Sequence, residues 1–200
     1  MVQIKICGLT RVDEAVACAD AGADALGLNF WPRSKRCVRD DVAAEIVTAV
    51  GERVRLVAVV VDASAARIAE IRGLGVRWVQ LHGDEPPELV SRYLPEAFKA
   101  VHFGGPHEPL DYPGEELLVD ARVGDLPGGT GVTCDWTAAA GLARQTRLWL
   151  AGGLTAENVA DAMDAVDPFG VDVASGVEGS PGRKDLEKVR RFIANARSAG

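Results

Sequence analysis

A cysteine and an aspartate, each at the end of a short apolar run, are the residues of this chain best suited to move protons. Cys7 ends the run at residues 2–7, and Asp120 ends the run at residues 117–120. A thiol becomes a base near neutral pH where its surroundings favour the thiolate, whereas a carboxyl partly removed from water can stay protonated. The pair predicts general acid–base catalysis. The alternatives are a small buried apolar side chain at Cys7 and a turn residue at Asp120.

Two loops that contain glycine, both in the last third of the chain, are suited to binding a phosphate. Gly152 and Gly153 follow one apolar run, and Ser175 and Gly176 follow the next. Because glycine has no Cβ, backbone N–H groups beside it can approach an anion closely. Loops after the last two strands of a barrel commonly lie side by side and bind phosphate. The pairing of the two loops therefore predicts a phosphorylated ligand, although either loop alone would be an ordinary turn.

Charged residues near these runs have more than one interpretation. The basic stretch at residues 33–36 ends in Arg36, whose guanidinium could bind a substrate carboxylate, or the stretch could be a solvated loop. Asp172 lies within an apolar strand, where a carboxylate needs a partner or a function. It could orient the substrate or pair with a lysine such as Lys5.

Other side chains offer competing chemistry. His82 and His102 could form a nucleophilic pair with Cys7, but no nucleophile elbow surrounds the cysteine. Asp125 competes with Asp120 as the acid. We expect the four tryptophans to pack between helices and strands rather than against a ligand.

Composition favours one globular domain over residues 1–200. The chain is 48% hydrophobic and 26% charged, and its net charge of −7 argues against a partner that is a nucleic acid or an anionic membrane. The start of the chain lacks the pattern of a signal peptide, and no apolar run reaches the ~18 residues of a membrane span. The four cysteines are widely spaced without a CxxC pair, so we expect reduced thiols, a cytoplasmic location and no metal site.

Apolar, strand-like runs alternate with helical patterns along the chain. The expected strands lie at residues 2–7, 25–30, 53–61, 77–81, 97–103 and 117–120, followed by the two runs before the glycine loops. Thr10 and residues 155–158 are expected to cap helices. Glycine and proline are frequent at residues 104–116, so the fifth helix must be much reduced.

This order predicts a closed (β/α)8 TIM barrel. Strands that are apolar throughout belong to a sheet buried on both faces, and strict alternation of strand and helix implies parallel strands. The rival fold is an open doubly wound sheet, whose glycine fingerprint near the N-terminus is absent. In a barrel, Cys7, Asp120 and the glycine loops would share the C-terminal rim.

Six segments, in this order, resemble the phosphoribosylanthranilate isomerase family of tryptophan biosynthesis over the whole chain. They are KICGLT at 5–10, GADALG at 22–27 with PRSKR at 32–36, VQLHG at 79–83, LVD at 118–120 before GGTG at 128–131, AGGLTAENV at 151–159 and VDVASGVE at 171–178. One departure is Cys134, where the family commonly has an aromatic residue before Asp-Trp.

The resemblance implies an Amadori rearrangement of N-(5-phosphoribosyl)anthranilate without a cofactor. Asp120 would protonate the ring oxygen, and Cys7 would remove the C2′ proton from the resulting iminium. Arg36 would bind the anthranilate carboxylate, and the loops at Gly152–Gly153 and Ser175–Gly176 would bind the phosphate. No metal is needed, because the protonated imine already accepts the electrons.

Two alternative functions remain at this point. One is an aldose–ketose isomerase of histidine biosynthesis, a barrel that usually carries an aspartate in place of Cys7. The other is a barrel that binds sugar phosphates without turnover. The sequence leaves open whether the protein is a monomer or a homodimer.

Overall fold

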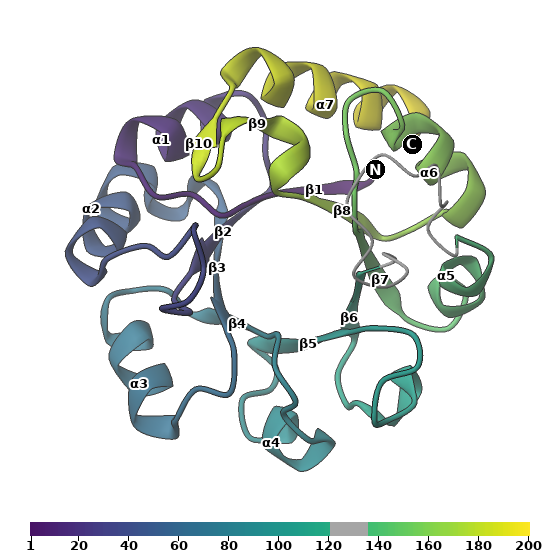
Figure 1. Ribbon diagram of the computed structural model, residues 1–200, viewed down its shortest axis with the longest axis horizontal. Helices are drawn as coiled ribbons and strands as arrows, with labels where there is room; N and C mark the ends of the chain where they lie inside the picture. Colours follow the sequence, from purple (N-terminus) through teal and green to yellow (C-terminus); the bar gives the residue numbers. More distant parts are fainter. Residues whose placement is uncertain (121–135) are drawn as a thin grey trace.

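Eight parallel strands close into a barrel that is surrounded by helices (Figure 1). The computed structural model describes residues 1–120 and 136–200. Each strand pairs with the next, and the last pairs with the first, as the predicted TIM barrel requires. The strands are β1 (Gln3–Cys7), β2 (Ala25–Asn29), β3 (Arg55–Val60), β4 (Trp78–Leu81), β5 (Ala97–Val101), β6 (Glu116–Asp120), β7 (Arg147–Ala151) and β8 (Gly170–Val173).

The helices follow the strands in alternation. They are α1 (Val12–Asp20), α2 (Asp40–Val50), α3 (Ala65–Gly73), α4 (Pro87–Ser91), α5 (Trp136–Ala143), α6 (Val159–Val166) and α7 (Leu186–Ala199). After β5 the chain forms only the 3-10 turn η2 (Pro109–Asp111), which confirms the reduced fifth helix. None of the helices in the described ranges is both long and apolar enough to cross a membrane.

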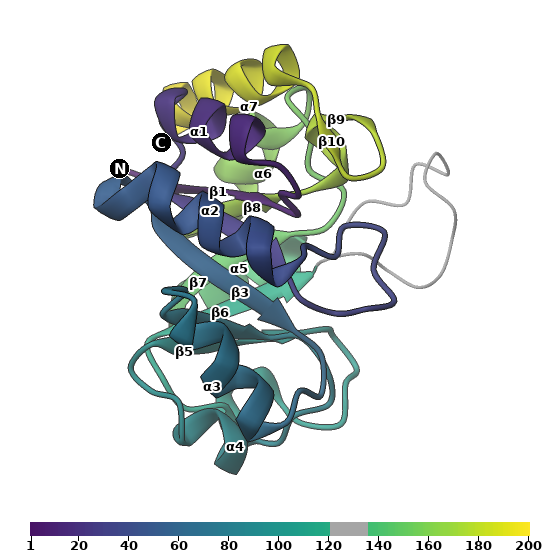
Figure 2. The same ribbon diagram turned by 90° about the vertical axis from the view of Figure 1, so that its left-hand side faces the viewer.

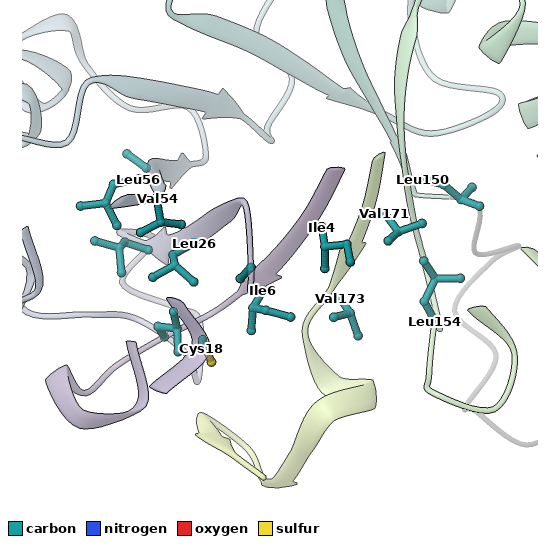
Figure 3. Close-up of a cluster of buried hydrophobic side chains, with 14 of the residues drawn as sticks. Ile4, Ile6, Cys18, Leu26, Val54, Leu56, Leu150, Leu154, Val171 and Val173 are labelled. Carbon is teal, nitrogen blue, oxygen red and sulfur yellow. The ribbon is translucent and has the colours of Figure 1, made fainter. Parts of the chain in front are cut away.

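Apolar side chains form two separate cores, one on each face of the strands. The outer core lies between strands and helices, and includes Ile4, Ile6, Val171 and Val173 of the adjacent strands β1 and β8 (Figure 3). The inner core fills the barrel with side chains that alternate with these along the strands: Ala25, Val57, Phe98, Ala100, Leu118, Trp149 and Ala151. Burial on both faces explains why most strand residues are apolar.

Trp149 is the largest side chain of the inner core. Its ring stacks on Phe98 with 6.5 Å between centroids, and its indole N–H donates to Glu116 at 2.8 Å. Gly170 is its register partner on β8, and a Cβ there would lie 2.6 Å from the indole ring. The expectation that the tryptophans pack between helices and strands is therefore wrong for Trp149, because the missing side chain of Gly170 makes room for it inside the barrel.

The two helix starts at which caps were expected have different outcomes. Thr10 does not cap α1, because its hydroxyl donates to the carbonyl of Gly182 at 2.8 Å. Residues 155–158 do cap the turn that leads into α6: the Thr155 hydroxyl accepts from the N–H of Glu157, and the Asn158 side chain accepts from the N–H of Thr155. The hydroxyl of Thr10 is therefore taken up by a partner far along the chain, which the local sequence does not reveal.

A short hairpin after β8 was not predicted. Its strands are β9 (Glu178–Ser180) and β10 (Arg183–Lys184). The hairpin and the loop after β2 lie at the same end of the barrel, away from the two termini (Figure 2). The two segments are in contact, since a Cβ on Gly182 would lie 3.1 Å from the Lys35 carbonyl. This contact brings Glu178 near the basic loop that carries Arg36.

We expect Gly170→Ala to destabilise the fold by about 1–3 kcal/mol, because the added methyl group would overpack the barrel against Trp149. The matched control is Gly141→Ala in α5, where nothing lies within 4 Å of the added Cβ and alanine favours the helix by up to about 1 kcal/mol. Urea unfolding of both variants measures the difference. Equal stability of the Gly170→Ala variant and the parent protein would contradict this packing.

Candidate active site

A cavity of about 340 Å³ opens at the C-terminal ends of the strands. In barrels of this type the reacting groups lie at this end. Of the residues singled out from the sequence, the cavity is lined by Cys7, Trp31, Arg36, His82, Asp120, Gly152, Gly153, Asp172 and Ser175. Side chains from strands as far apart in the chain as β1 and β6 therefore share one space.

Cys7 is the last residue of β1, and its half-buried thiol faces the cavity. Gly27 on β2 lies opposite, and a Cβ there would stand 2.6 Å from the Cys7 sulfur, so glycine leaves room for the thiol. Burial raises the pKa of Cys7 because it disfavours the thiolate. The positive charges of Lys5 and Lys184 oppose this effect.

A buried polar network lies one layer deeper in the barrel than the thiol. Lys5 donates to Asp172 at 2.9 Å and to the Gln80 side-chain oxygen at 2.9 Å. Because an ammonium can only donate, the amide oxygen of Gln80 must face Lys5 and its nitrogen must face His82, 2.7 Å from Nδ1. Asp172 thus pairs with Lys5, which was one of the two roles expected for it from the sequence. Sequence reasoning missed Gln80, although it lies in the resembling segment at 79–83.

The network also defines the state of His82. Burial, together with the positive charges of Lys5 and His102, lowers the pKa of His82 to about 4. The ring is therefore neutral near pH 7, with Nδ1 accepting from Gln80 and Nε2 carrying the proton. Within the described residues Cys7 has Lys5 as its hydrogen-bond partner. The geometry therefore does not support a Cys–His nucleophilic pair.

Asp120 ends β6 beside Ala151 of β7 and lines the same cavity as Cys7. Its side chain is half-buried. When it is ionised, its carboxylate partly opposes the lowering of the His82 pKa, so the two side chains are close enough to interact. The competing acid, Asp125, and the unusual Cys134 lie outside the described residues.

Arg36 reaches the cavity from the loop after β2, where a carboxylate of the chain orients it. Its Nε and Nη2 donate to the two carboxylate oxygens of Glu178, both at 2.7 Å, and Lys184 donates to the same carboxylate at 3.1 Å. Burial opposes ionisation of Glu178, but these bonds outweigh it and lower its pKa. The guanidinium has five N–H groups, so three remain for other acceptors. Sequence reasoning missed Glu178, although it ends the last of the resembling segments.

The two glycine loops meet at the cavity. Gly152 and Gly153 have φ values of +98° and +69°, a conformation that side chains other than glycine rarely adopt. Gly176 packs on the backbone after β7, where a Cβ would stand 1.9 Å from the Leu154 carbonyl oxygen. Gly176 thus lets the loops approach each other, while Gly152, Gly153 and Ser175 line the cavity.

Trp31 is a second departure from expectation, because it lines the cavity instead of packing between helices and strands. Its backbone N–H donates to the side-chain oxygen of Asn29 at 2.9 Å, which fixes the start of the loop. Among residues 1–120 and 136–200, no three His, Cys, Asp or Glu side chains are grouped so that they could hold a metal ion.

Comparison with known proteins agrees with this geometry. A family model described as N-(5'phosphoribosyl)anthranilate (PRA) isomerase matches residues 4–195. The chain belongs to this isomerase family. Among curated relatives, the N-(5'-phosphoribosyl)anthranilate isomerase of Myxococcus xanthus is 44% identical, with 98% of this chain and 97% of the relative covered. That of Pseudomonas paraeruginosa is 45% identical, with 100% and 97% covered.

Solved structures of PRA isomerases are also similar. The enzyme from Thermotoga maritima has a TM-score of 0.87 and 36% identity, covering 99% of this chain and 100% of its own. A phosphoribosyl anthranilate isomerase in complex with reduced 1-(o-carboxyphenylamino)-1-deoxyribulose 5-phosphate has a TM-score of 0.83 and 34% identity, with 99% and 100% covered.

Family membership makes the chain an isomerase of tryptophan biosynthesis with a TIM-barrel fold. The other two interpretations, a histidine-pathway isomerase and a non-catalytic sugar-phosphate-binding barrel, are not favoured by these relatives. A PRA isomerase needs one group that gives a proton and one that takes a proton, and the cavity contains side chains suited to both.

The low pKa of His82 predicts a specific pH dependence of stability. The folded value of about 4 lies below the ordinary 6.5, so between these pH values the unfolded chain binds the proton and stability falls as the pH is lowered. His82→Gln should therefore lose less free energy of unfolding between pH 7 and pH 5 than the parent protein. Urea titrations at both pH values, with the exposed His107→Gln as matched control, test this. An equal change in both variants would contradict it.

Proposed function

We propose that Cys7 is the general base and Asp120 the general acid of the PRA isomerase reaction. The observation that supports this most directly is that both side chains line one cavity, although they come from β1 and β6. Asp120 protonates the furanose ring oxygen, the C1′–oxygen bond breaks, and a protonated imine forms. Cys7 then removes the C2′ proton, and the electron pair moves to form the enolamine. The enolamine tautomerises to the aminoketose product.

Arg36 binds the carboxylate of the anthranilate ring in this proposal. Glu178 occupies Nε and one N–H of Nη2, which leaves the other side of the guanidinium for a second carboxylate. The anthranilate ring of the substrate would then lie near Trp31, which lines the same cavity. The product analogue bound by the solved relative carries such a carboxyphenyl group.

The glycine loops at Gly152–Gly153 and Ser175–Gly176 bind the phosphate of the substrate. Backbone N–H groups in such loops can point at an anion without a side chain in the way. Asp172 also contacts the substrate, since it lines the cavity while its Oδ1 accepts from Lys5. The phosphate of the analogue in the solved relative requires a site of this kind.

The remaining features of the proposal concern the whole molecule. The enzyme is a single domain over residues 1–200, acts in the cytoplasm and works without a cofactor as a monomer or a homodimer. The net charge of −7 supports a small anionic substrate held by local geometry, and neither a nucleic acid nor a membrane as partner. Sedimentation analysis of the purified protein distinguishes the two oligomeric states.

Cys7→Ala and Asp120→Asn should each lower kcat at least about a hundredfold, because each removes one of the two proton-transfer groups. The loss of anthranilate-type fluorescence measures turnover, and circular dichroism checks the fold. Cys37→Ala is the matched control, since this thiol lies on the loop after β2 and does not line the cavity. Near-full activity of either site variant would refute the role assigned to that residue.

Arg36→Met should raise KM by roughly tenfold to a hundredfold with a small effect on kcat, because a charge-assisted bond to the substrate is lost. Glu178→Gln should raise KM less, since it loosens the orientation of Arg36 but keeps the guanidinium. Arg33→Met, at an exposed position of the same loop, is the control. A decrease confined to kcat in the Arg36 variant would count against the carboxylate role.

A further inference from the structure

Lys5 is fully buried in the barrel, two residues before Cys7 on the same inward face of β1. Its ammonium has three N–H groups and three acceptors: Asp172 at 2.9 Å, Gln80 at 2.9 Å and the sulfur of Cys7, to which it is hydrogen-bonded. A buried ammonium is stable only when it is paired and fully hydrogen-bonded. The sulfur is therefore one of the acceptors that complete the surroundings of the lysine.

Charged groups from several elements act on the Cys7 thiol. Lys5 on β1, Lys184 on β10 and Arg36 on the loop after β2 favour the thiolate, and Asp172 on β8 opposes it. Lys184 and Arg36 are both bonded to Glu178, which offsets their charges. Lys5 is the strongest of the favourable influences on the thiol.

We propose that Lys5 is a positioning residue for the isomerase reaction: anchored by Asp172 and Gln80, its ammonium lies beside the sulfur of Cys7 and stabilises the thiolate form in which Cys7 accepts the substrate proton. This inference rests on the assignment of Cys7 as the base. It explains why a lysine lies inside the barrel, where an apolar side chain would fill the same space at no desolvation cost.

Asp172 has a second function in this arrangement. Burial lowers the pKa of Lys5, but the carboxylate of Asp172 and the thiolate of Cys7 outweigh it, so the net shift is upward. Asp172 therefore keeps the lysine charged through the reaction, including the stage at which Cys7 holds the substrate proton and is neutral. Gln80 orients the ammonium from a third strand, β4.

The test is the pH dependence of Cys7 alkylation by iodoacetamide in Lys5→Met, followed by mass spectrometry of the Cys7 peptide. Loss of a positive charge within hydrogen-bond distance should raise the apparent pKa of the thiol by at least about one unit, so alkylation at pH 7 falls about tenfold. The acidic limb of the pH profile of kcat should shift to higher pH by the same amount, with KM nearly unchanged. Lys99→Met, which removes a buried lysine bonded to the carbonyls of Leu81 and Gly83, should leave the alkylation curve in place.

If Lys5→Met does not fold, Lys5→Met with Asp172→Leu replaces the ion pair by an apolar pair and leaves no unpaired buried charge. Its alkylation curve should still be shifted to higher pH than that of the parent protein. A curve that coincides with the parent curve in a folded variant overturns the proposal. Alkylation is independent of turnover, so this outcome is distinct from a failure of the proposed function, which an active Cys7→Ala variant would reveal.

Discussion

An ion pair between the first and last strands is the interaction on which the rest of the site depends. Lys5 and Asp172 are register partners on β1 and β8, and they meet at 2.9 Å inside the barrel. Removal of one partner of such a pair leaves a buried charge uncompensated, which costs about 3–5 kcal/mol. The pair therefore favours closure of the barrel in one register. That register places Cys7 one layer above the ammonium, at the edge of the cavity.

The cations around the cavity are oriented by carboxylates of the chain before any substrate arrives. Asp172 holds Lys5, and Glu178 holds both Arg36 and Lys184. Donors that are already oriented lose little conformational entropy when an anion binds. In the proposed site, this arrangement lets a protein of net charge −7 hold a substrate that carries a carboxylate and a phosphate.

The order of strands and helices could be predicted because strands buried on both faces are apolar throughout, and because glycine and proline at residues 104–116 exclude a full fifth helix. Details that depend on partners far along the chain could not be predicted. Thr10 bonds to the carbonyl of Gly182, 172 residues away, instead of capping its helix. Trp31 lines the cavity, which residues from several strands and loops form together only in the closed barrel.

By itself, the sequence determined that the chain alternates strands and helices and that a thiol, a carboxyl and two glycine loops stand at strand ends. Only the tertiary structure decided which side chains come into contact. Arg36 bonds to Glu178, 142 residues away along the chain, and Lys5 bonds to Gln80, 75 residues away. The physical reason is that a hydrogen bond requires a set distance and angle between two side chains. Strand register and barrel closure set both, and neither leaves a periodic signal in the local sequence.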